Sequence, residues 1–468
     1  GIALNAVSTF AGNISNAGTI TAKTGISIVG STVSGSIFDS GNISASKIGI
    51  SIDAQSAIIT ANTAIAVTGS TFTGGITNAG TISAGGAGID VNNVNVTSFG
   101  GGITNVGTIR AATGIVVNST GFSGAIFNAG TISGTGGTAI NVSGAKTAIT
   151  IDQTAGLISG AVRLSAHSDV FNISGGSIAG NIVGSGALDT VNFKLNTGTF
   201  TYGPSYGFSG IHQVNVTSGT VVLNGNNTAS GMTVSAAGTL AGTGTITTTN
   251  GVSVAGTLDP GTPGTAGGVL TISGGLAFAH SAVYLDTISG TSASSTLIST
   301  GTVSLGGAGV SIAGTVKSGY EYTILTSTST ISGTFSPTVA YAGGLIGEIT
   351  YSANDEDVYL TFLNSAGCYV GPFPHVNTFN VNCIQVANTS FSGGISNAGT
   401  ISTGGIVVTG STINGSISDS GWILGGGISI DSASAVLASK TAISVTGSTF
   451  MGGITNAGTI SAGGAGID

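Results

Sequence analysis

Charged residues are scarce in this chain of 468 residues, because only 5% are Asp, Glu, Lys or Arg. The eight Lys and Arg residues are scattered along the sequence, and 16 acidic residues give a net charge of −8. Nucleic-acid-binding proteins carry basic patches that neutralise phosphates, so this composition excludes that class of function. With two Arg residues in total, the chain also lacks the clustered basic side chains that a β-helical polysaccharide lyase would use.

Long apolar runs are absent as well. No stretch of about 18 apolar residues occurs, so the sequence predicts no membrane-spanning helix. Gly, Ser, Thr or Asn instead interrupts the apolar residues every one or two positions, which is the pattern of short β-strands. A hydrophobic content of 40% is too high for a disordered chain.

Cysteine and histidine are rare, which limits the chemistry that the chain can carry. Cys368 and Cys383 are the only cysteines and lie close in sequence, so we expect one disulfide and an oxidising compartment. Two free buried thiols are the alternative. The four histidines lack metal-ligand spacing, and no phosphate-binding loop or nucleophile elbow occurs. The sequence therefore predicts no catalytic, cofactor or metal site and no enzyme activity.

One nine-residue phrase, Gly-x-Ile-x-Asn-x-Gly-Thr-Ile, recurs through the sequence. In the first part of the chain it starts at positions 12, 35, 74, 101 and 124, and the interval from 35 to 74 is the longest. Self-similarity at such periods indicates a solenoid, in which each repeat contacts mainly its neighbours. The full copies and the two near copies begin at Gly12, Gly74, Gly101, Gly124, Gly393 and Gly452, and at Gly35 and Gly415.

Each phrase predicts two short strands joined at Asn-x-Gly, and a third strand follows in most repeats. We therefore expect an all-β protein, a right-handed parallel β-helix whose turns match the spacing of the phrase. Stacked turns would bring identical side chains to about 4.8 Å, as a buried aromatic column and an amide ladder. An exposed aromatic track for carbohydrate is the alternative for the rings. The expected column and ladder are Phe10, Phe72, Phe99, Phe122, Phe391 and Phe450, and Asn16, Asn78, Asn105, Asn128, Asn397 and Asn456.

From about residue 201 the phrase disappears, but the β pattern continues. Five segments follow in this order: an AGTLAGTGTI rung, a GTLDPGTPG turn, a LTISGGLAF strand, a YTILTSTSTISGTF hairpin and a closing VYLTFL strand. Over roughly residues 215–364 this series resembles the end of an autotransporter passenger domain from a Gram-negative bacterium. In that family the segment caps the β-helix and helps it fold just before the outer-membrane barrel. The resemblance implies export to the bacterial cell surface, with such a barrel as a partner during export.

The chain departs from that family after Asn364, where no membrane barrel follows and fresh stem repeats appear. Either a tandem second unit begins near residue 365, or residues 366–468 precede residue 1 in the natural subunit. If Asp468 is joined to Gly1, the interval between the starts at Gly452 and Gly12 nearly equals that between Gly74 and Gly101, which favours the second explanation. The expected segments are stem repeats at 1–200, a passenger-end segment at 201–364, a disulfide-pinned cap at 365–389 and stem repeats at 390–468.

The function expected from these patterns is structural. Open ends of solenoid sheets must be capped or paired, and end-to-end pairing yields filaments, so we expect head-to-tail homopolymers in an extracellular filament or stalk. A monomeric adhesin that binds host or matrix ligands laterally is the runner-up, and a polysaccharide-active β-helix enzyme is third. The interface is expected to join the closing strand to the aromatic cap. Its expected residues are Val358, Tyr359, Leu360, Phe362, Tyr369, Phe373 and Phe379.

Overall fold

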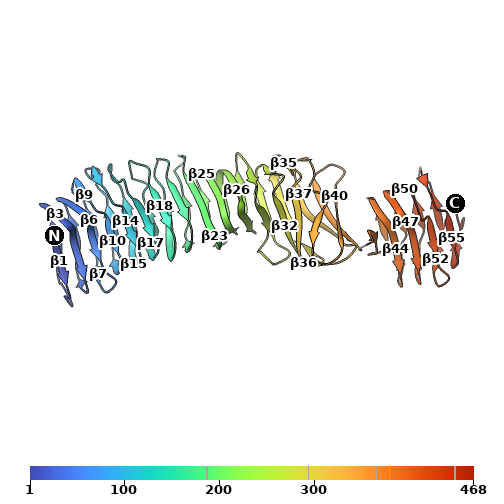
Figure 1. Ribbon diagram of the computed structural model, residues 1–468, viewed down its shortest axis with the longest axis horizontal. Coiled ribbons are helices and arrows are strands. Elements are labelled where there is room, and N and C mark those ends of the chain that lie inside the picture. Colours follow the sequence, from blue (N-terminus) through green and yellow to red (C-terminus); the bar gives the residue numbers. More distant parts are fainter. Residues whose placement is uncertain (186–187, 294, 365, 379, 447–448) are drawn as a thin grey trace. The chain divides into compact units, whose positions relative to one another are not determined.

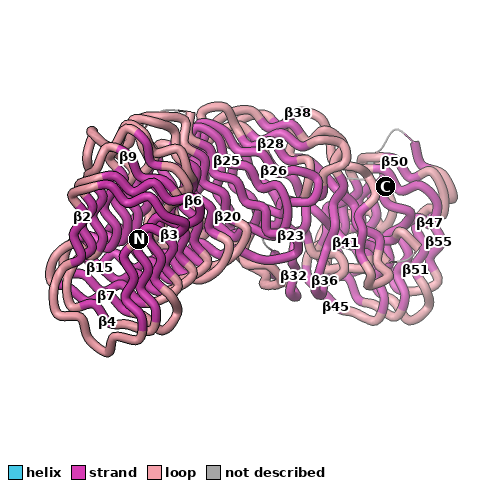
Figure 2. Tube along the Cα trace, turned by 60° about the vertical axis from the view of Figure 1, so that its left-hand side comes forward, coloured by secondary structure: helices cyan, strands magenta, loops and turns pink. Residues whose placement is uncertain are grey.

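The structure is a computed structural model, which describes residues 1–468 except 186–187, 294, 365, 379 and 447–448. Across these described residues it is all-β with no helix, and mostly parallel strands stack as a β-solenoid of about 19 turns (Figure 1). The tube in Figure 2 shows the same strands stacked side by side, with loops at the corners of the turns. The prediction of an all-β parallel solenoid is confirmed.

The chain divides into two compact units, each assembled from several segments. The first unit consists of Gly1–Pro263, Val269–Val283 and Thr296–Gly306. The second unit consists of Gly264–Gly268, Tyr284–Ser295 and Gly307–Asp468. The four segments expected from the sequence divide the chain by repeat type rather than by compactness, and they stay predictions.

One turn of the first unit shows how the repeated phrase folds. It contributes β10 (Ile76–Asn78), β11 (Thr81–Ala84) and β12 (Ala87–Val91). The Ile side chains of these strands point inward and are buried. On the next turn, β14 (Ile103–Asn105) pairs in parallel with β10 and β15 (Thr108–Val117) pairs with β11 and β12, so that identical positions lie above one another.

The aromatic column forms across three successive turns. Phe72, Phe99 and Phe122 are each at most 1% exposed. Their rings are stacked, with centroids 4.8 Å apart for Phe72 and Phe99 and 5.0 Å apart for Phe99 and Phe122. The rings are core elements of the solenoid, so an exposed carbohydrate track at these three positions is excluded.

A ladder of buried side-chain amides runs along the same turns. Asn78 Nδ2 donates to Asn105 Oδ1 at 2.8 Å, and Asn105 Nδ2 donates to Asn128 Oδ1 at 2.8 Å. Asn128 Nδ2 in turn donates to Gln153 Oε1 at 2.7 Å. Each Asn amide also reaches the carbonyl oxygen two residues ahead, so the ladder ties every corner to the next turn.

The predicted single column through all copies of the phrase is wrong for Phe10. Phe10 pairs with Val33 on the next turn, whereas the residue opposite Phe72 on the preceding turn is Ile43. The cause is the long interval between the phrase starts at Gly35 and Gly74, which exceeds one turn. The phrase therefore moves from one sheet of the solenoid to another at this point.

The same shift separates Asn16 from the ladder that starts at Asn78. Asn16 Nδ2 donates to Asp39 Oδ1 at 2.6 Å, and the residue opposite Asp39 on the following turn is Val67. Asp39 is fully buried, and its second carboxylate oxygen has no hydrogen-bond partner. Burial raises the pKa of this carboxyl.

In the second unit, parallel stacking gives way to an antiparallel arrangement. β37 (Glu321–Ser327) pairs with β41 (Asp357–Leu363), and β41 pairs with β40 (Ile346–Tyr351), both in antiparallel register. The hairpin expected within YTILTSTSTISGTF is therefore wrong. The backbone N–H groups of Ser327 and Ile331 instead donate to the turn that precedes β41, at Glu356 and Asp355.

Parallel stacking resumes with β42 (Cys368–Tyr369), β44 (Asn380–Ala387) and β47 (Thr400–Thr409) around a hydrophobic core that extends from Leu363 to Ile443.

The later copies of the phrase again fall into different columns. Phe391 stacks on Phe373 with centroids 5.1 Å apart and lies opposite Ile413, whereas Phe450 lies opposite Ile423. Asn397 bonds Asn377 and Asp419, whereas Asn456 is exposed and lies opposite Ile430. The interval between the starts at Gly415 and Gly452 again exceeds one turn.

Candidate assembly junction

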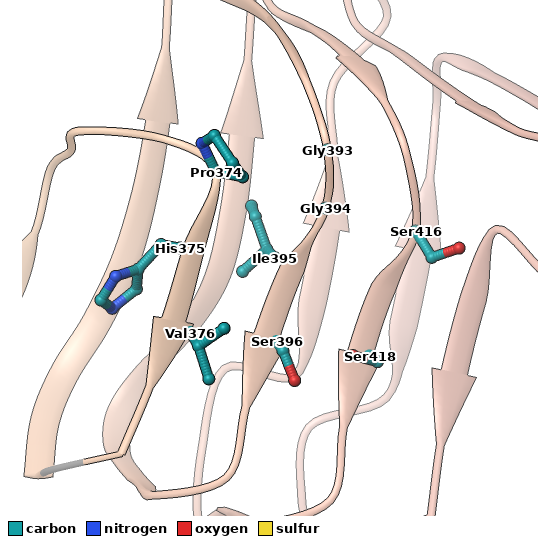
Figure 3. A pocket seen from close by; sticks show the side chains of 9 residues that line it. All are labelled: Pro374, His375, Val376, Gly393, Gly394, Ile395, Ser396, Ser416 and Ser418. Atoms are coloured by element: carbon teal, nitrogen blue, oxygen red, sulfur yellow. The ribbon is translucent and has the colours of Figure 1, made fainter.

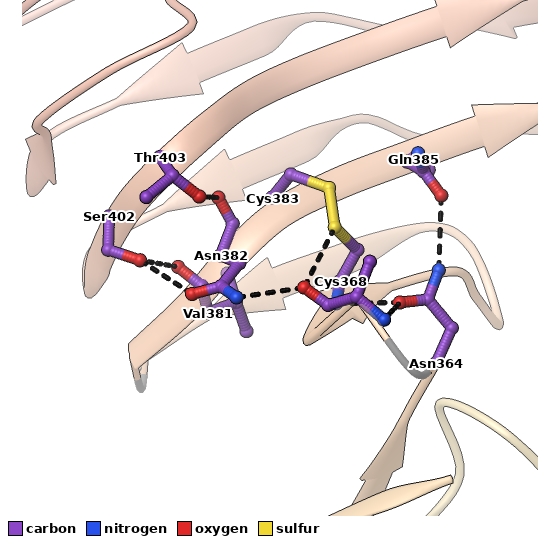
Figure 4. The surroundings of a disulfide bond; sticks show 9 residues. Asn364, Cys368, Val381, Asn382, Cys383, Gln385, Ser402 and Thr403 are labelled. Carbon is purple, nitrogen blue, oxygen red and sulfur yellow. Dashed lines mark hydrogen bonds between the residues drawn. A yellow bond between two sulfur atoms is a disulfide. The ribbon is translucent and has the colours of Figure 1, made fainter. Parts of the chain in front are cut away.

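The predicted disulfide joins Cys368 to Cys383, which occupy directly opposed positions of β42 and β44 (Figure 4). Asn364 organises the turn that leads into β42. Its Oδ1 accepts hydrogen bonds from the backbone N–H groups of Ala366 and Cys368, both at 3.0 Å, and its Nδ2 donates to Gln385 Oε1 at 3.1 Å. The covalent bond and this amide fix the first parallel turn that follows β41.

Tyr369 connects this turn to the segment that precedes β37. Its hydroxyl donates to the carbonyl oxygens of Pro372, at 2.6 Å, and of Gly319, at 3.3 Å. Its ring stacks on His375, with centroids 3.5 Å apart, and meets Phe373 edge-on at 5.7 Å. We call the contact of residues 317–321 with residues 369–376 the junction.

Gly319 brings the two backbones of the junction together. Its φ of 73° lies in the left-handed region, which favours glycine. A Cβ at this position would overlap the carbonyl oxygen of Gly371, so no other residue fits without moving one backbone. Sequence reasoning missed Gly319, because a close approach between segments far apart in the sequence leaves no local pattern in a glycine-rich chain.

The residues predicted for an assembly interface divide into two groups. Val358, Leu360 and Phe362 of β41 are 0% exposed and pack inside their own unit. This corrects the predicted interface, since alternate residues of β41 point into the core. Tyr359 is half-buried on the outer side of β41.

The aromatic residues that follow β41 do lie at the junction. Tyr369 is 3% exposed, and Phe373 is partly buried against the core of the following turns. Phe379 lies outside the described residues. The structure therefore brings Tyr369 and Phe373 together, next to Gly319.

Two cavities of about 400 Å³ flank the junction. The first is lined by residues that include Glu321, Thr361, Tyr369 and His375. Burial lowers the pKa of His375 to about 4, so its imidazole is neutral at physiological pH. The second cavity has a more basic edge and is lined by Lys317, Ser318, Val370, Gly371, Pro372, Phe373, Ala387, Thr389, Ser390 and Phe391.

A third hollow, of about 410 Å³, lies on the face formed by β43 (His375–Asn377), β46 (Ile395–Asn397) and β49 (Ile417–Asp419). Figure 3 shows Val376, Ser396 and Ser418 side by side on these strands, with Pro374 at one end of the groove. Val376 is 60% exposed. The groove is lined by three apolar side chains, Pro374, Val376 and Ile395, and by the hydroxyls of three serines.

No group of three or more His, Cys, Asp or Glu side chains gathers among the described residues. No helix in the part of the chain that the structure describes is long and apolar enough to cross a membrane. No known family matches the sequence, and no curated protein matches it either. Function must therefore be argued from the fold and the junction themselves.

Proposed function

We propose that this chain is a structural subunit of an extracellular filament or stalk, built by head-to-tail stacking of β-solenoids. The observation that carries the proposal is the junction, where the antiparallel end of one stack meets the first turn of another. Solenoid ends expose unpaired strand edges. A subunit that binds another copy of itself end to end forms an open filament rather than a closed oligomer. The junction joins two stacks of one chain, and we take a contact of the same kind to join one subunit to the next.

The composition of the surface supports the same role. With few charges on the stacked turns, like charges do not accumulate from turn to turn, and the contact between stacks depends on backbone and aromatic groups. Filaments held in this way should be insensitive to salt. Kinship with secreted autotransporter passengers of Gram-negative bacteria belongs to this proposal as well, and it rests on the order of motifs between residues 215 and 364.

The test compares two glycines that have the same backbone conformation but different surroundings. Gly319 and Gly344 have φ of 73° and 75°. A Cβ at Gly319 would overlap Gly371, whereas a Cβ at Gly344 would meet nothing within 4 Å. Gly319→Ala and Gly344→Ala therefore impose similar backbone strain, and only the first separates the two sides of the junction.

We expect ordered filaments in negative-stain electron microscopy from Gly344→Ala and none from Gly319→Ala. Deleting residues 365–386 should likewise leave solenoid stems without ordered filaments. Unchanged filaments from both the deletion and Gly319→Ala would contradict the junction as the assembly contact. A strictly monomeric protein would instead favour an adhesin that binds ligands laterally. The groove at Val376 would then be the candidate ligand-binding site.

A further inference from the structure

One peptide bond of the chain joins an aspartate to a proline. Asp259 and Pro260 are the only Asp–Pro pair in the sequence, and they end β29 (Thr257–Pro260). The nitrogen of this bond is a tertiary amide without an N–H, so it donates no hydrogen bond to the sheet. A prolyl nitrogen is also more basic than an ordinary amide nitrogen, which makes it the better leaving group when it takes up a proton.

The carboxyl of Asp259 is buried without a compensating charge. The residue is 4% exposed, and its Oδ1 is buried without a hydrogen-bond partner. Burial of this kind favours the neutral form of a carboxyl over the charged form. It raises the pKa of Asp259 to about 6, whereas the ordinary value is 3.8. Asp259 is therefore largely a neutral carboxylic acid in mildly acidic surroundings.

The elements beside Asp259 supply no opposing charge. β29 pairs with β26 (Asn226–Gly242), where Ala241 lies opposite Asp259, and with β32 (Val283–Gly290). β26 and the loop at 261–268 carry no titratable side chain. β32 carries Tyr284 and Asp286, which are both buried and are not cations. Burial is the only cause of the raised pKa of Asp259.

The two groups that would react belong to one residue. Attack by a carboxyl oxygen of Asp259 on its own backbone carbonyl carbon closes a five-membered ring, and rotation within the side chain brings the atoms together. No hydrogen bond to Oδ1 has to break first. An intramolecular attack needs no second molecule to be positioned, which is a large advantage in rate.

We propose that the chain cleaves itself between Asp259 and Pro260 in mildly acidic surroundings, with the carboxyl of Asp259 as the nucleophile. The carboxyl oxygen bonds to the backbone carbonyl carbon, and the bond from that carbon to the Pro260 nitrogen breaks. The carboxyl proton passes to this nitrogen, which leaves as a secondary amine. One water then opens the cyclic anhydride left on Asp259 to two carboxyl groups, so the net change is the addition of one water.

The surroundings of the bond decide what happens to the two pieces. Asp259 stays in the ladder with β26, and Gly261 exchanges two backbone hydrogen bonds of 2.8 Å with Gly242. Thr262 and Pro263 are exposed, so water lies within a few residues of the bond. The pieces 1–259 and 260–468 should therefore stay together in the folded protein and separate only on denaturation. This cleavage does not depend on filament assembly.

The experiment follows cleavage of the full-length protein, folded and in guanidinium chloride, by mass spectrometry under denaturing conditions. We expect fragments 1–259 and 260–468, whose masses sum to that of the parent plus one water. At about pH 5 the neutral fraction of the carboxyl is about 0.9 in the folded protein and about 0.06 in the unfolded chain, so folded protein should be cleaved at least about tenfold faster. Folded protein should also be cleaved at least about tenfold more slowly at about pH 7.5 than at about pH 5.

Two variants remove the reacting groups one at a time. Asp259→Asn removes the acid, and Pro260→Ala replaces the prolyl nitrogen by an ordinary amide, so each should slow cleavage at this bond by at least about tenfold. Pro263→Ala is the matched control, because this exposed proline follows Thr262, and it should be cleaved as fast as the parent.

The comparison of folded with unfolded parent needs no variant, so it decides the matter even if a substitution prevents folding. An uncleaved parent at about pH 5, or a folded parent that is cleaved no faster than the unfolded chain, would overturn the proposal. Undiminished cleavage at this bond in Asp259→Asn would overturn it as well.

Discussion

Replacing Phe99 by alanine tests how the stacked column stabilises the solenoid. Phe99 is 0% exposed and lies between two rings, 4.8 Å from Phe72 and 5.0 Å from Phe122. Truncating a fully buried Phe costs about 3–5 kcal/mol, from the lost transfer free energy and the cavity left behind. Both ring stacks are lost together, so we expect a value near the upper part of that range.

The effect should be local, because a solenoid turn contacts mainly its neighbours. Hydrogen exchange followed by mass spectrometry measures this directly, since amide protection reports the free energy of local opening. A loss of about 3 kcal/mol or more corresponds to opening that is at least about a hundredfold more frequent. We expect that change in peptides covering residues 71–128, and little change beyond residue 200.

Phe38→Ala is the matched control, because Phe38 is 39% exposed on β5 (Ile37–Asp39) of the same unit. It should alter exchange far less than Phe99→Ala does. Equal effects of the two substitutions, or a Phe99→Ala protein with unchanged protection, would refute the reasoning that the column is a packed core.

Three further predictions follow from buried groups. Asp39→Asn should raise Tm at pH 7, because a carboxyl with a raised pKa destabilises the fold once it ionises. This gain in Tm over the parent should vanish as the pH falls toward 4. Asp355→Asn, on an exposed turn, is the control and should show no gain in Tm. Reducing the Cys368–Cys383 disulfide, whose cysteines are 15 residues apart, should cost about 3 kcal/mol in the chain-entropy account, measured by denaturant unfolding with and without reductant. The junction should loosen as the pH falls from about 6.5 toward 4, because His375 binds a proton more readily in the unfolded chain than in the folded one. Faster opening, measured by hydrogen exchange of the backbone amides near Tyr369, would show this. An opening rate that does not depend on pH would count against it.

The sequence was sufficient to predict the stacked turns and part of their interior. Phe72, Phe99 and Phe122 belong to the copies of the phrase that begin at positions 74, 101 and 124, where each interval equals one turn, so the rings meet. Phe10 and Asn16 lie outside the column and the ladder because the longer interval from position 35 to position 74 exceeds one turn. The number of turns between two copies depends on the strands in between, which a repeat count alone does not reveal.

The junction was harder to predict than the turns. The disulfide followed from two isolated cysteines, but the alternation of β41 did not reveal which side faces the core. Leu360 and Phe362 look like an apolar end surface in the sequence and lie inside the unit in the structure.

Negative-stain electron microscopy of the purified full-length protein, over a wide range of protein concentration and at low and high salt, tests the central claim most directly. The account predicts unbranched filaments whose length grows with protein concentration and changes little with salt. A protein that stays monomeric across the whole range would contradict head-to-tail assembly.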